Sequence, residues 1–340
     1  MKPRLLVIAG PTASGKSELA LRLAQQLDAE IVCADSLTIY RGIDIGSAKP
    51  TTLQRSLVPH HLLDIRNPSE AFTVADFISE ATTAIHQILK RGKRPIVAGG
   101  TGLYLRALLG GLADAPGENP EIRMQLRMRG EREGGLQMLE ELRQIDPITA
   151  ESCHQNNLLR IIRGLEVWHS TGKPLSSFHA GHGFQDSHYD HLFICLQMQR
   201  DELYKRIEKR VDLMLEQGLV AEVKALLDSG LPEDAKPLMA IGYKEVTAYL
   251  KGRLDLTAMS TLIKQNTRNL AKRQITWFKK ESALQLVAYP ENSVTIETVA
   301  STFFKEGEKP HVKNSLQHSG PIPEPGPQGK GQGNSQDDVR

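Results

Sequence analysis

The stretch "LLVIAGPTASGKS", residues 5–17, decides the fold. Its apolar half predicts a buried strand over residues 4–9, and the spacing Gly10-x4-Gly15-Lys16-Ser17 is that of a P-loop leading into a helix at 16–27. In such a loop, successive backbone N–H groups surround a phosphate chain, while the lysine supplies charge and the hydroxyl binds Mg²⁺. We therefore expect a phosphate-binding loop that comprises Gly10, Pro11, Thr12, Ala13, Ser14, Gly15, Lys16 and Ser17.

Strand and helix patterns alternate after this loop. A short strand is expected at 30–34, followed by Asp35; a helix at 74–89 precedes a strand at 95–98, and another strand is expected at 191–198. This alternation predicts an α/β fold, a P-loop NTPase-like parallel sheet flanked by helices. Carboxyl ends of parallel strands share one edge of a sheet, so Asp35 should lie near the P-loop. Taken alone, an aspartate at a strand end is equally compatible with a turn or a helix cap.

The pattern changes at about residue 114, where helical periodicity with many charges replaces strand patterns. We expect residues 1–113 and 191–285 to form the catalytic core with basic C-terminal helices, and residues 114–190 to form an inserted all-helical domain. Residues 307–340 are rich in Pro, Gly, Gln and Ser, which predicts a disordered tail.

Composition excludes several classes of protein. The 340-residue chain has a formal net charge of +2 and the apolar and charged content of a soluble globular enzyme. Cys33, Cys153 and Cys195 lack metal-ligand spacing, which argues against a zinc module or a disulfide framework and fits a cytoplasmic location. No apolar run reaches the roughly 18 residues of a membrane span, and the first run passes directly into the P-loop, so neither a membrane segment nor a signal peptide is expected.

The P-loop alone leaves its chemistry open. A hydrolase normally carries an acidic residue after a second apolar strand, whereas "PIVAGGTG" ends in glycines and Thr101, and no N-K-x-D motif indicates a GTPase. A small-molecule kinase remains possible, because such enzymes also place an acidic residue after the second strand. A nucleotide-gated RNA-binding protein without covalent chemistry is a further alternative.

A basic segment near the end of the core indicates a nucleic-acid partner. Residues 264–280, "KQNTRNLAKRQITWFKK", contain six Lys or Arg and no Asp or Glu. On a helix, Lys264, Arg268, Lys272 and Lys279 share one stripe, while Ile263, Leu270 and Trp277 share an apolar one. The first stripe predicts contact with RNA phosphates, and Trp277 is assigned to the core.

Taken together, the motifs resemble those of bacterial tRNA dimethylallyltransferases of the IPP transferase family. Over about the first 285 residues, in the family's order, they are "GPTASGKS" (10–17), "DSLTIYRGIDIGSAKP" (35–50), "PHHLLDI" (59–65), "FTVADF" (72–77), "GGTGLYLRALLGGL" (99–112), "LLRIIRGLEVWHSTGKPLS" (158–176), "RIEKRVDLMLEQGLVAEV" (206–223), "AIGYKE" (240–245) and "TRNLAKRQITWFKK" (267–280). Met239 departs from the pattern, because a polar Arg or Gln often precedes "AIGY" in the family.

The resemblance implies transfer of the dimethylallyl group of dimethylallyl diphosphate to N6 of adenosine 37 in the anticodon loop of tRNAs that read codons beginning with U, with release of diphosphate. Asp35 would be the base, Thr101 its hydrogen-bonding partner near the amine, and Lys16 would stabilise the leaving group together with Mg²⁺ bound partly by Ser17. ATP is not expected as a reactant. A closely related alternative is transfer to free adenine nucleotides.

The resemblance also implies an interface with the tRNA anticodon stem-loop, on an enzyme expected to be a monomer. The residues carried over to this interface are Asp35, Ser36, Leu37, Thr38, Thr101, Arg123, Leu159, Arg160, Ile161, Ile162, Arg163, Ala240, Ile241, Gly242, Tyr243, Lys244 and Glu245. For Arg123 a solvated helix charge is the alternative interpretation, and for Arg160 and Arg163 it is a core helix with arginines at its edge.

Overall fold

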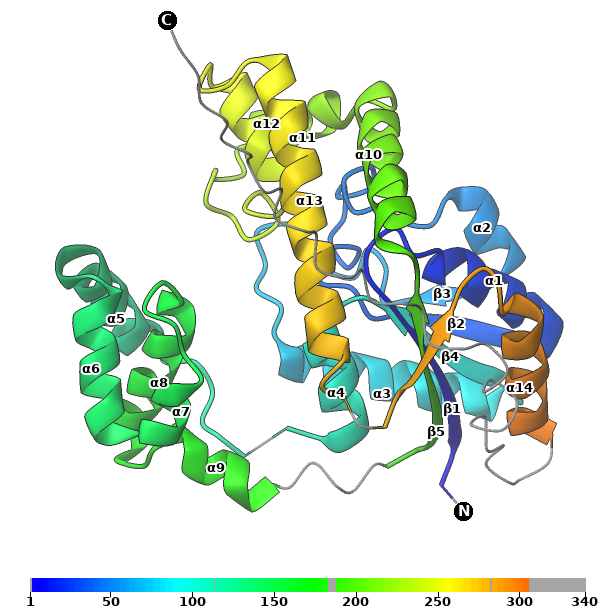
Figure 1. Cartoon of the computed structure of the whole chain (residues 1–340), viewed down its shortest axis with the longest axis horizontal. Coiled ribbons are helices and arrows are strands. Elements are labelled where there is room, and N and C mark those ends of the chain that lie inside the picture. The colour runs from blue at the N-terminus through cyan, green and yellow to red at the C-terminus, as the bar shows by residue number, and fades with distance from the viewer. Residues whose placement is uncertain (1, 113, 183–187, 282, 306–340) are drawn as a thin grey trace, which may run out of the picture.

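A six-stranded parallel sheet forms the centre of the computed structural model, which describes residues 2–112, 114–182, 188–281 and 283–305 (Figure 1). The spatial order of the strands is β3-β2-β4-β1-β5-β6. Their bounds are β1 Arg4–Ala9, β2 Ala29–Cys33, β3 His60–His61, β4 Arg94–Gly99, β5 Asp190–Gln197 and β6 Gln285–Ala288. The predicted parallel sheet is thereby confirmed.

Side chains alternate between the two faces of the sheet, and each face has its own apolar core. On one face, Leu6 and Ile8 of β1 pack with α1 (Lys16–Leu27) and α14 (Ser293–Lys305). On the other face, Leu5 and Val7 pack with α3 (Val74–Lys90) and α4 (Gly102–Gly110). Strands buried on both faces explain the continuous apolar runs in the sequence.

The strand order places the loops that matter at one edge. The β1-α1-β2 connection passes over β4, because β4 pairs with both β1 and β2. Loops leaving adjacent strands on opposite sides open a crevice at their carboxyl ends, where ligands of α/β proteins bind. The P-loop and Asp35 follow such strand ends, and Gly99 is the last residue of β4.

Further helices cover this edge. They are α2 (Thr52–Leu57), α10 (Arg200–Glu216), α11 (Leu219–Asp228), α12 (Tyr243–Leu250) and α13 (Leu256–Phe278). Asp255 caps the long α13 by accepting a hydrogen bond from Ala258 N at 2.8 Å. In Figure 1, α13 runs between the sheet and a separate helical lobe.

That lobe is the inserted segment. It consists of α5 (Pro120–Glu133), α6 (Gly135–Ile145), α7 (Pro147–Glu151), α8 (Leu158–Thr171) and α9 (Leu175–His182), and its described residues contain no strand. Leu126, Met138, Leu142, Ile161 and Leu165 form a core of its own. The lobe therefore buries its apolar residues without help from the sheet.

The structure differs from the sequence predictions at the ends of the sheet. The strand at β3 is only two residues long, too short for a sequence pattern to reveal. Beyond residue 285, where the predicted core ended, β6 pairs with β5 and α14 packs on α1. The core therefore extends to Lys305, and the predicted disordered tail at 307–340 lies outside the described residues. None of the helices in the described ranges is both long and apolar enough to cross a bilayer.

Candidate active site

A cavity of about 430 Å³ opens at the carboxyl edge of the sheet. Its lining combines the P-loop (Lys16, Ser17), the end of β2 (Asp35), α10 (Arg210) and α13 (Gln274). A second, wider hollow of about 870 Å³ adjoins it and shares Lys16, Ser17 and Arg210. The motifs that are far apart in the sequence thus meet at one place.

The P-loop has the backbone shape that phosphate binding requires. Gly10, Ala13 and Gly15 have φ angles of 154°, 65° and 89°, which turn the chain tightly between β1 and α1. No side chain caps the N-terminus of α1, so its first N–H groups are available to an anion. The ring of Tyr289 lies so close to Gly15 that an added Cβ would approach it to 2.8 Å. Tyr289 therefore packs directly against the backbone of the P-loop.

Three cations, Lys16, Arg210 and Lys236, and the carboxylate of Asp35 line the cavity. Burial is the largest influence on Lys16 and lowers its pKa to about 8; the nearby positive Arg210 lowers it further, while Asp35 opposes both. Burial also lowers the pKa of Arg210, again opposed by Asp35. Among the residues that the structure describes, Lys16 has no ion-pair partner, and its Nζ lies 3.4 Å from Pro11 O. A cation held without a carboxylate partner is available to an anionic ligand.

Arg210 is the site residue that the sequence predictions missed. It lies on α10 between Ile207 and Met214, both of which line the same cavity. The apolar residues 207, 211 and 214 form the buried face of α10, and Arg210 lies within this pattern. This charged residue could have indicated a binding site, since a cation on a buried helix face needs a partner or a ligand.

Asp35 is both a turn residue and a cavity residue. Its Oδ1 accepts hydrogen bonds from Leu37 N at 2.8 Å and Thr38 N at 3.4 Å, which fixes the carboxylate after β2. The same residue lines the cavity that Lys16 lines. The predicted placement of Asp35 at the P-loop edge is therefore confirmed.

Thr101 occupies the neighbouring turn, at the start of α4. Its N–H donates to Ala34 O at 3.4 Å, and Gly99 approaches the same carbonyl so closely that a Cβ there would lie 2.0 Å from it. Only glycine permits this contact between the ends of β2 and β4. Thr101 lies beside the cavity but is not among its lining residues, so its proposed contact with the acceptor stays a prediction.

The cysteines and histidines near the cavity have defined roles in the fold. Burial raises the pKa of the Cys33 and Cys195 thiols to about 12 each, so neither is a thiolate nucleophile near pH 7. His60 donates through Nδ1 to Val58 O at 2.8 Å, and His61 Nε2 lies 2.6 Å from buried Glu30. In the described part of the chain, no group of three or more His, Cys, Asp or Glu is arranged around a metal site.

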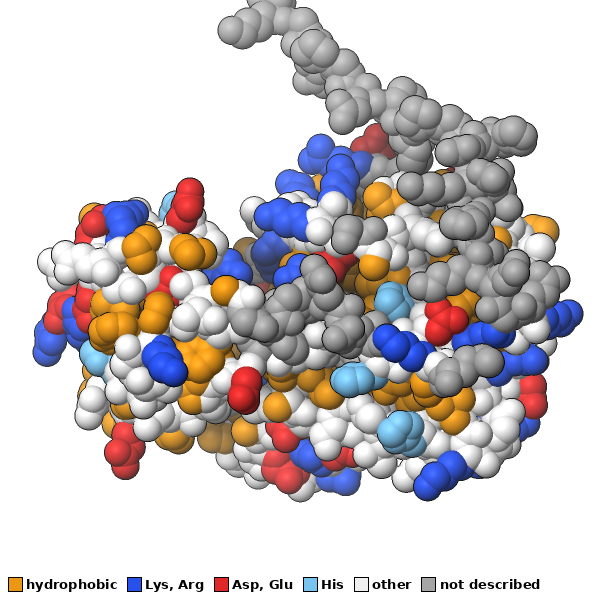
Figure 2. Space-filling model, turned by 90° about the horizontal axis from the view of Figure 1, so that it is seen from below, with side chains coloured by type: hydrophobic (Ala, Val, Ile, Leu, Met, Phe, Trp, Pro, Cys, Tyr) orange, Lys and Arg blue, Asp and Glu red, His pale blue; other side chains and the backbone are white. Residues whose placement is uncertain are grey.

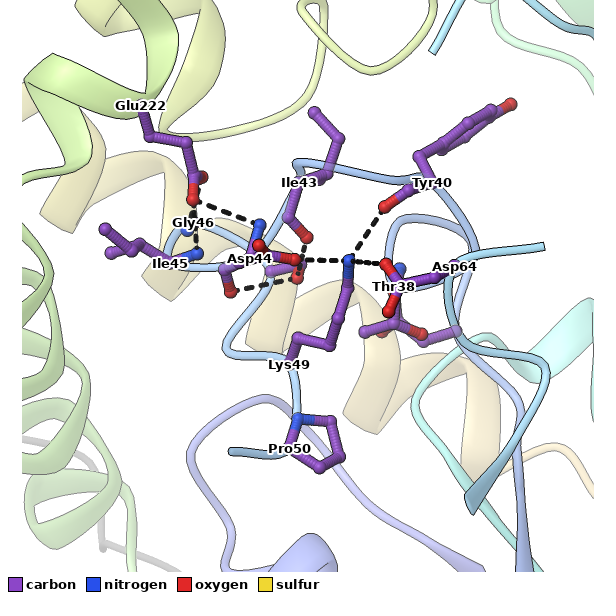
Figure 3. A network of polar contacts seen from close by, with 12 residues as sticks. Thr38, Tyr40, Ile43, Asp44, Ile45, Gly46, Lys49, Pro50, Asp64 and Glu222 are labelled. Carbon is purple, nitrogen blue, oxygen red and sulfur yellow. Dashed lines mark hydrogen bonds and ion pairs between the residues drawn. The ribbon is translucent and has the colours of Figure 1, made fainter. Parts of the chain in front are cut away.

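Lys49 holds the segment 35–50 in place from inside. Its side chain is 1% exposed, and its Nζ donates to Tyr40 O at 2.8 Å, Asp44 Oδ1 at 2.5 Å and Asp64 Oδ1 at 2.6 Å (Figure 3). Gly46, Ser47 and Ala48, which follow Asp44, line the cavity. The ammonium therefore anchors both ends of the turn that forms one wall of the site.

Glu222 holds the same turn from α11. One of its oxygens accepts from Asp44 N at 3.1 Å and Ile45 N at 2.8 Å, and the other accepts from Gly46 N at 3.3 Å (Figure 3). The second oxygen also accepts from the Tyr243 hydroxyl at 2.6 Å. The Tyr243 ring covers Gly46, where an added Cβ would come within 2.4 Å of it. The carboxylate thus joins segment 35–50 to α11 and α12.

Only part of the predicted tRNA-binding motif at 240–245 faces the cavity. Ala240, Ile241 and Gly242 line it, as does the 57% exposed Met239 that departs from the family pattern. The side chains of Tyr243 and Glu245 are buried, and their predicted contact with tRNA stays a prediction. Glu245 accepts hydrogen bonds from Gly242 N and from Asn266 Nδ2 on α13, so it fixes the loop. Lys244 is exposed.

The predicted tRNA-binding residues of the helical lobe differ in exposure. The side chains of Ile161 and Ile162 lie in the lobe's core, so contact of these two positions with tRNA stays a prediction that these side chains do not carry. Arg123 and Arg163 both bind the buried carboxylate of Glu166, at 2.7 Å and 2.9 Å. Arg123 therefore holds α5 to α8, while Arg163, on the same helix as Glu166, also donates to Pro116 O and Gly117 O ahead of α5. The side chains of Leu159 and Arg160 are exposed and remain candidates for tRNA contact.

The basic stripe of α13 divides into two halves. Lys264 pairs with Asp212 at 2.6 Å and Arg268 with Glu208 at 2.5 Å, both on α10, so acidic residues from another helix neutralise this half. Lys272 and Lys279 are exposed. Figure 2 shows Lys and Arg side chains gathered on the core beside the hollow that separates it from the helical lobe. Trp277 is partly buried against the core, as predicted, and Arg106 lies over its ring at 4.5 Å.

The donor set of the cavity fits Mg²⁺. Ser17 offers a hydroxyl and Asp35 a carboxylate at the P-loop. Mg²⁺ prefers oxygen ligands and is commonly held by one or two protein groups, several waters and substrate phosphates. A cavity with one carboxylate and several cations suits a metal ion that arrives with a phosphate ligand.

Comparisons with known proteins agree on one family. The family model described as IPP transferase matches residues 38–281. A tRNA dimethylallyltransferase 1 of Trichlorobacter lovleyi is 64% identical over 304 residues, covering 89% of this chain and 100% of the relative. One from Pelobacter propionicus is 52% identical over 303 residues, covering 89% and 98%.

Solved structures give the same result. The full-length tRNA isopentenylpyrophosphate transferase of Bacillus halodurans is 37% identical with a TM-score of 0.66, covering 93% of this chain and 100% of that one. A eukaryotic dimethylallyltransferase acting on tRNA is 28% identical with a TM-score of 0.75, covering 92% and 84%. The similarity thus extends over nearly the whole length of both proteins.

Proposed function

Because this chain belongs to the IPP transferase family, we propose that it is a tRNA dimethylallyltransferase that transfers a dimethylallyl group from dimethylallyl diphosphate to N6 of the adenosine after the third anticodon base. The observation that carries the proposal is the meeting of Lys16, Arg210 and Asp35 in one cavity at the P-loop. Two cations suit a diphosphate, and a carboxylate beside them suits an acceptor that must lose a proton.

The diphosphate is the leaving group in this reaction. As the C1–O bond of the allyl diphosphate breaks, its electron pair stays on the diphosphate, and charge builds on the oxygens nearest the carbon. Lys16, Arg210 and the N–H groups at the start of α1 would stabilise that charge. When bound, Mg²⁺ held partly by Ser17 would neutralise further charge.

The acceptor is a weak nucleophile, because the lone pair of the adenine N6 is delocalised into the ring. As the N6–C bond forms, one N6 proton must leave, and Asp35 would accept it. The two backbone N–H groups that bind its Oδ1 orient the carboxylate. Thr101 would position the amine from the adjacent turn.

The tRNA would approach through the hollow between the core and the helical lobe, with its anticodon loop toward the cavity. An unstacked loop adenosine is extruded at a cost of only a few kcal/mol, which suits a buried site. We further propose that the protein acts as a monomer in the cytoplasm.

Single-turnover transfer of a labelled dimethylallyl group to an anticodon stem-loop with consecutive adenosines tests the proposal. We expect label on N6 with the wild type and a rate about 10²- to 10⁴-fold lower for Asp35→Asn, with stem-loop affinity retained. Asp228→Asn, an exposed carboxylate on α11 that pairs only with Lys224, is the matched control and should behave as the wild type. Absence of transfer by the wild type, with ATP-dependent phosphorylation of a small acceptor, would instead identify a kinase.

A further inference from the structure

Gln274 joins the two loops on which the proposed reaction depends. It lies on α13, and its Oε1 accepts from the N–H of Thr12 in the P-loop at 2.8 Å. Its Nε2 donates to the carbonyl of Gly100, in the turn between β4 and α4, at 2.9 Å. The amide orientation is fixed by chemistry, because a backbone N–H only donates and a carbonyl only accepts. One side chain thus bridges residues 12 and 100.

The bridge is closely packed. A Cβ added at Gly100 would lie 2.5 Å from Gln274 Nε2, so the amide rests directly on the backbone of the turn. One helical turn further along α13, the Trp277 ring covers Gly102 in the same way, at 2.3 Å from an added Cβ. Thr101 lies between these two glycines, so side chains of α13 pack against the residues on both sides of Thr101.

The same helix presents cations to solvent. Lys272 and Lys279 lie on either side of Gln274 in the sequence and are exposed. An RNA backbone that binds these lysines therefore contacts the same helix that contacts the P-loop and the turn of Thr101. No other side chain in the described residues makes hydrogen bonds to both loops.

We propose that Gln274 is a positioning residue for the transfer reaction: it sets the P-loop relative to the turn of Thr101 and connects tRNA docking on α13 with the diphosphate site. This inference rests on the proposed function. Gln274 touches backbone groups rather than reacting atoms, so it acts through the two loops. Its loss should therefore affect the use of both substrates.

The chemistry of the bridge allows a variant whose function depends on pH. Gln274→Glu keeps an acceptor for Thr12 N–H, but the ionised carboxylate has no proton to donate to Gly100 O and places negative charge beside the diphosphate. The protonated carboxylic acid again has one donor and one acceptor in the arrangement of the amide. The variant should recover as the pH falls, whereas Gln274→Leu, which has neither group, should not.

The experiment compares kcat and KM for dimethylallyl diphosphate and for the stem-loop between pH 5.5 and 8.5, each variant as a ratio to the wild type at the same pH. We expect Gln274→Leu to lose at least about tenfold in kcat/KM for both substrates at every pH. Gln274→Glu should lose as much at pH 8.5 and regain part of the loss toward pH 5.5, because burial against the Gly100 carbonyl raises the pKa of the new carboxyl above its ordinary value of about 4.3. Gln87→Glu, an exposed glutamine on α3, is the matched control and should stay at the wild-type ratio.

Two results would overturn the inference while leaving the proposed function intact: wild-type kinetics for both Gln274 variants, or a deficit of Gln274→Glu that does not change with pH. If the wild type itself transfers no label, the proposed function fails. Titration with inorganic pyrophosphate, which needs no transfer, then decides whether Gln274 orders the P-loop: weaker binding by Gln274→Leu supports it, and equal binding refutes it. Recovery of Gln274→Glu within one protein sample also excludes misfolding.

Discussion

At the scale of single residues, the charges that line the cavity favour the binding of an anion. Lys16, Arg210 and Lys236 carry three positive charges against the one carboxylate of Asp35, and the first two lie at the P-loop. Lys16 is the group most affected, since its pKa falls from 10.5 to about 8. An anion that binds there relieves the repulsion between the two cations and restores the charged form of the lysine.

Pyrophosphate affinity should therefore depend on pH through Lys16. A lysine with a pKa of about 8 in the free protein is charged below pH 8 and loses its proton above it, so affinity should be greatest below pH 8 and fall by about tenfold per unit above it. Calorimetric titration at pH 7 and pH 9 measures this, and proton uptake should accompany binding near pH 8. Lys16→Arg is the control: its side chain stays charged, so any pH dependence of its affinity reports the ionisation of pyrophosphate itself. Equal pH dependence in both proteins would contradict the assignment.

At the scale of one element, α13 has two roles that its sequence does not separate. Its N-terminal half is tied to α10 through Lys264 and Arg268, and the ion pairs there are partly exposed. Its C-terminal half carries Lys272 and Lys279 without ion-pair partners among the residues that the structure describes. We therefore expect the C-terminal half of α13 to provide the electrostatic attraction for RNA.

Paired charge substitutions should separate these roles. Replacing Lys272 and Lys279 by Gln should weaken stem-loop binding and flatten its dependence on salt by about 0.7 to 0.9 per lost phosphate contact. Replacing Lys264 and Arg268 by Gln should change the salt dependence less and lower the free energy of unfolding by up to about 1 kcal/mol for each pair. Fluorescence anisotropy from 50 to 300 mM salt and thermal unfolding measure the two effects. Equal salt dependence for the two double variants would show that the whole stripe meets RNA.

At the scale of the whole molecule, the two ends of the described chain meet in one structure. Arg4 Nη1 on β1 donates to Phe303 O at 3.0 Å and to Phe304 O at 3.2 Å on α14. Tyr289, just after β6, packs on the P-loop. The C-terminal strand and helix are therefore part of the core that supports the diphosphate site.

Two truncations should behave differently. Removal of residues 310–340 should leave transfer activity unchanged. Removal of residues 285–340 deletes β6 and α14 together with the buried side chains of Ile296, Val299 and Phe303. Burial of each such side chain contributes about 1.5–3 kcal/mol, so the loss approaches the whole stability of a domain, and the shorter protein should unfold or aggregate. Thermal unfolding and pyrophosphate titration test this; a stable, ligand-binding shorter protein would contradict it.

Sequence patterns predicted the parts of the fold that long apolar periods determine. The helix at 16–27 agrees with α1 to the residue, and the strands near 30–34 and 191–198 differ from β2 and β5 by one residue. Short elements were missed, because two residues at β3 or four at β6 carry too little pattern to distinguish a strand from a loop.

The site was predictable only where the backbone determines it. P-loop spacing and a strand end suffice to place Lys16, Ser17 and Asp35. Motifs carried over as whole segments do not separate exposed from buried positions, because a helix turns every third or fourth residue inward and thereby buries the side chains of Ile161, Ile162 and Glu245. Pairing between distant residues, such as Arg123 with Glu166, is invisible to a local pattern.

The contact of Tyr289 with Gly15 also has a consequence for synthesis of the protein. A ribosome makes the P-loop among the first residues and its cover among the last, so hundreds of residues separate the two in time. Because domains begin to fold from the N-terminus during translation, β5 of the partly synthesised sheet lacks its partner strand until β6 emerges. A messenger RNA broken after the codons for α13 would therefore yield a chain that carries every motif of the family but lacks a finished enzyme.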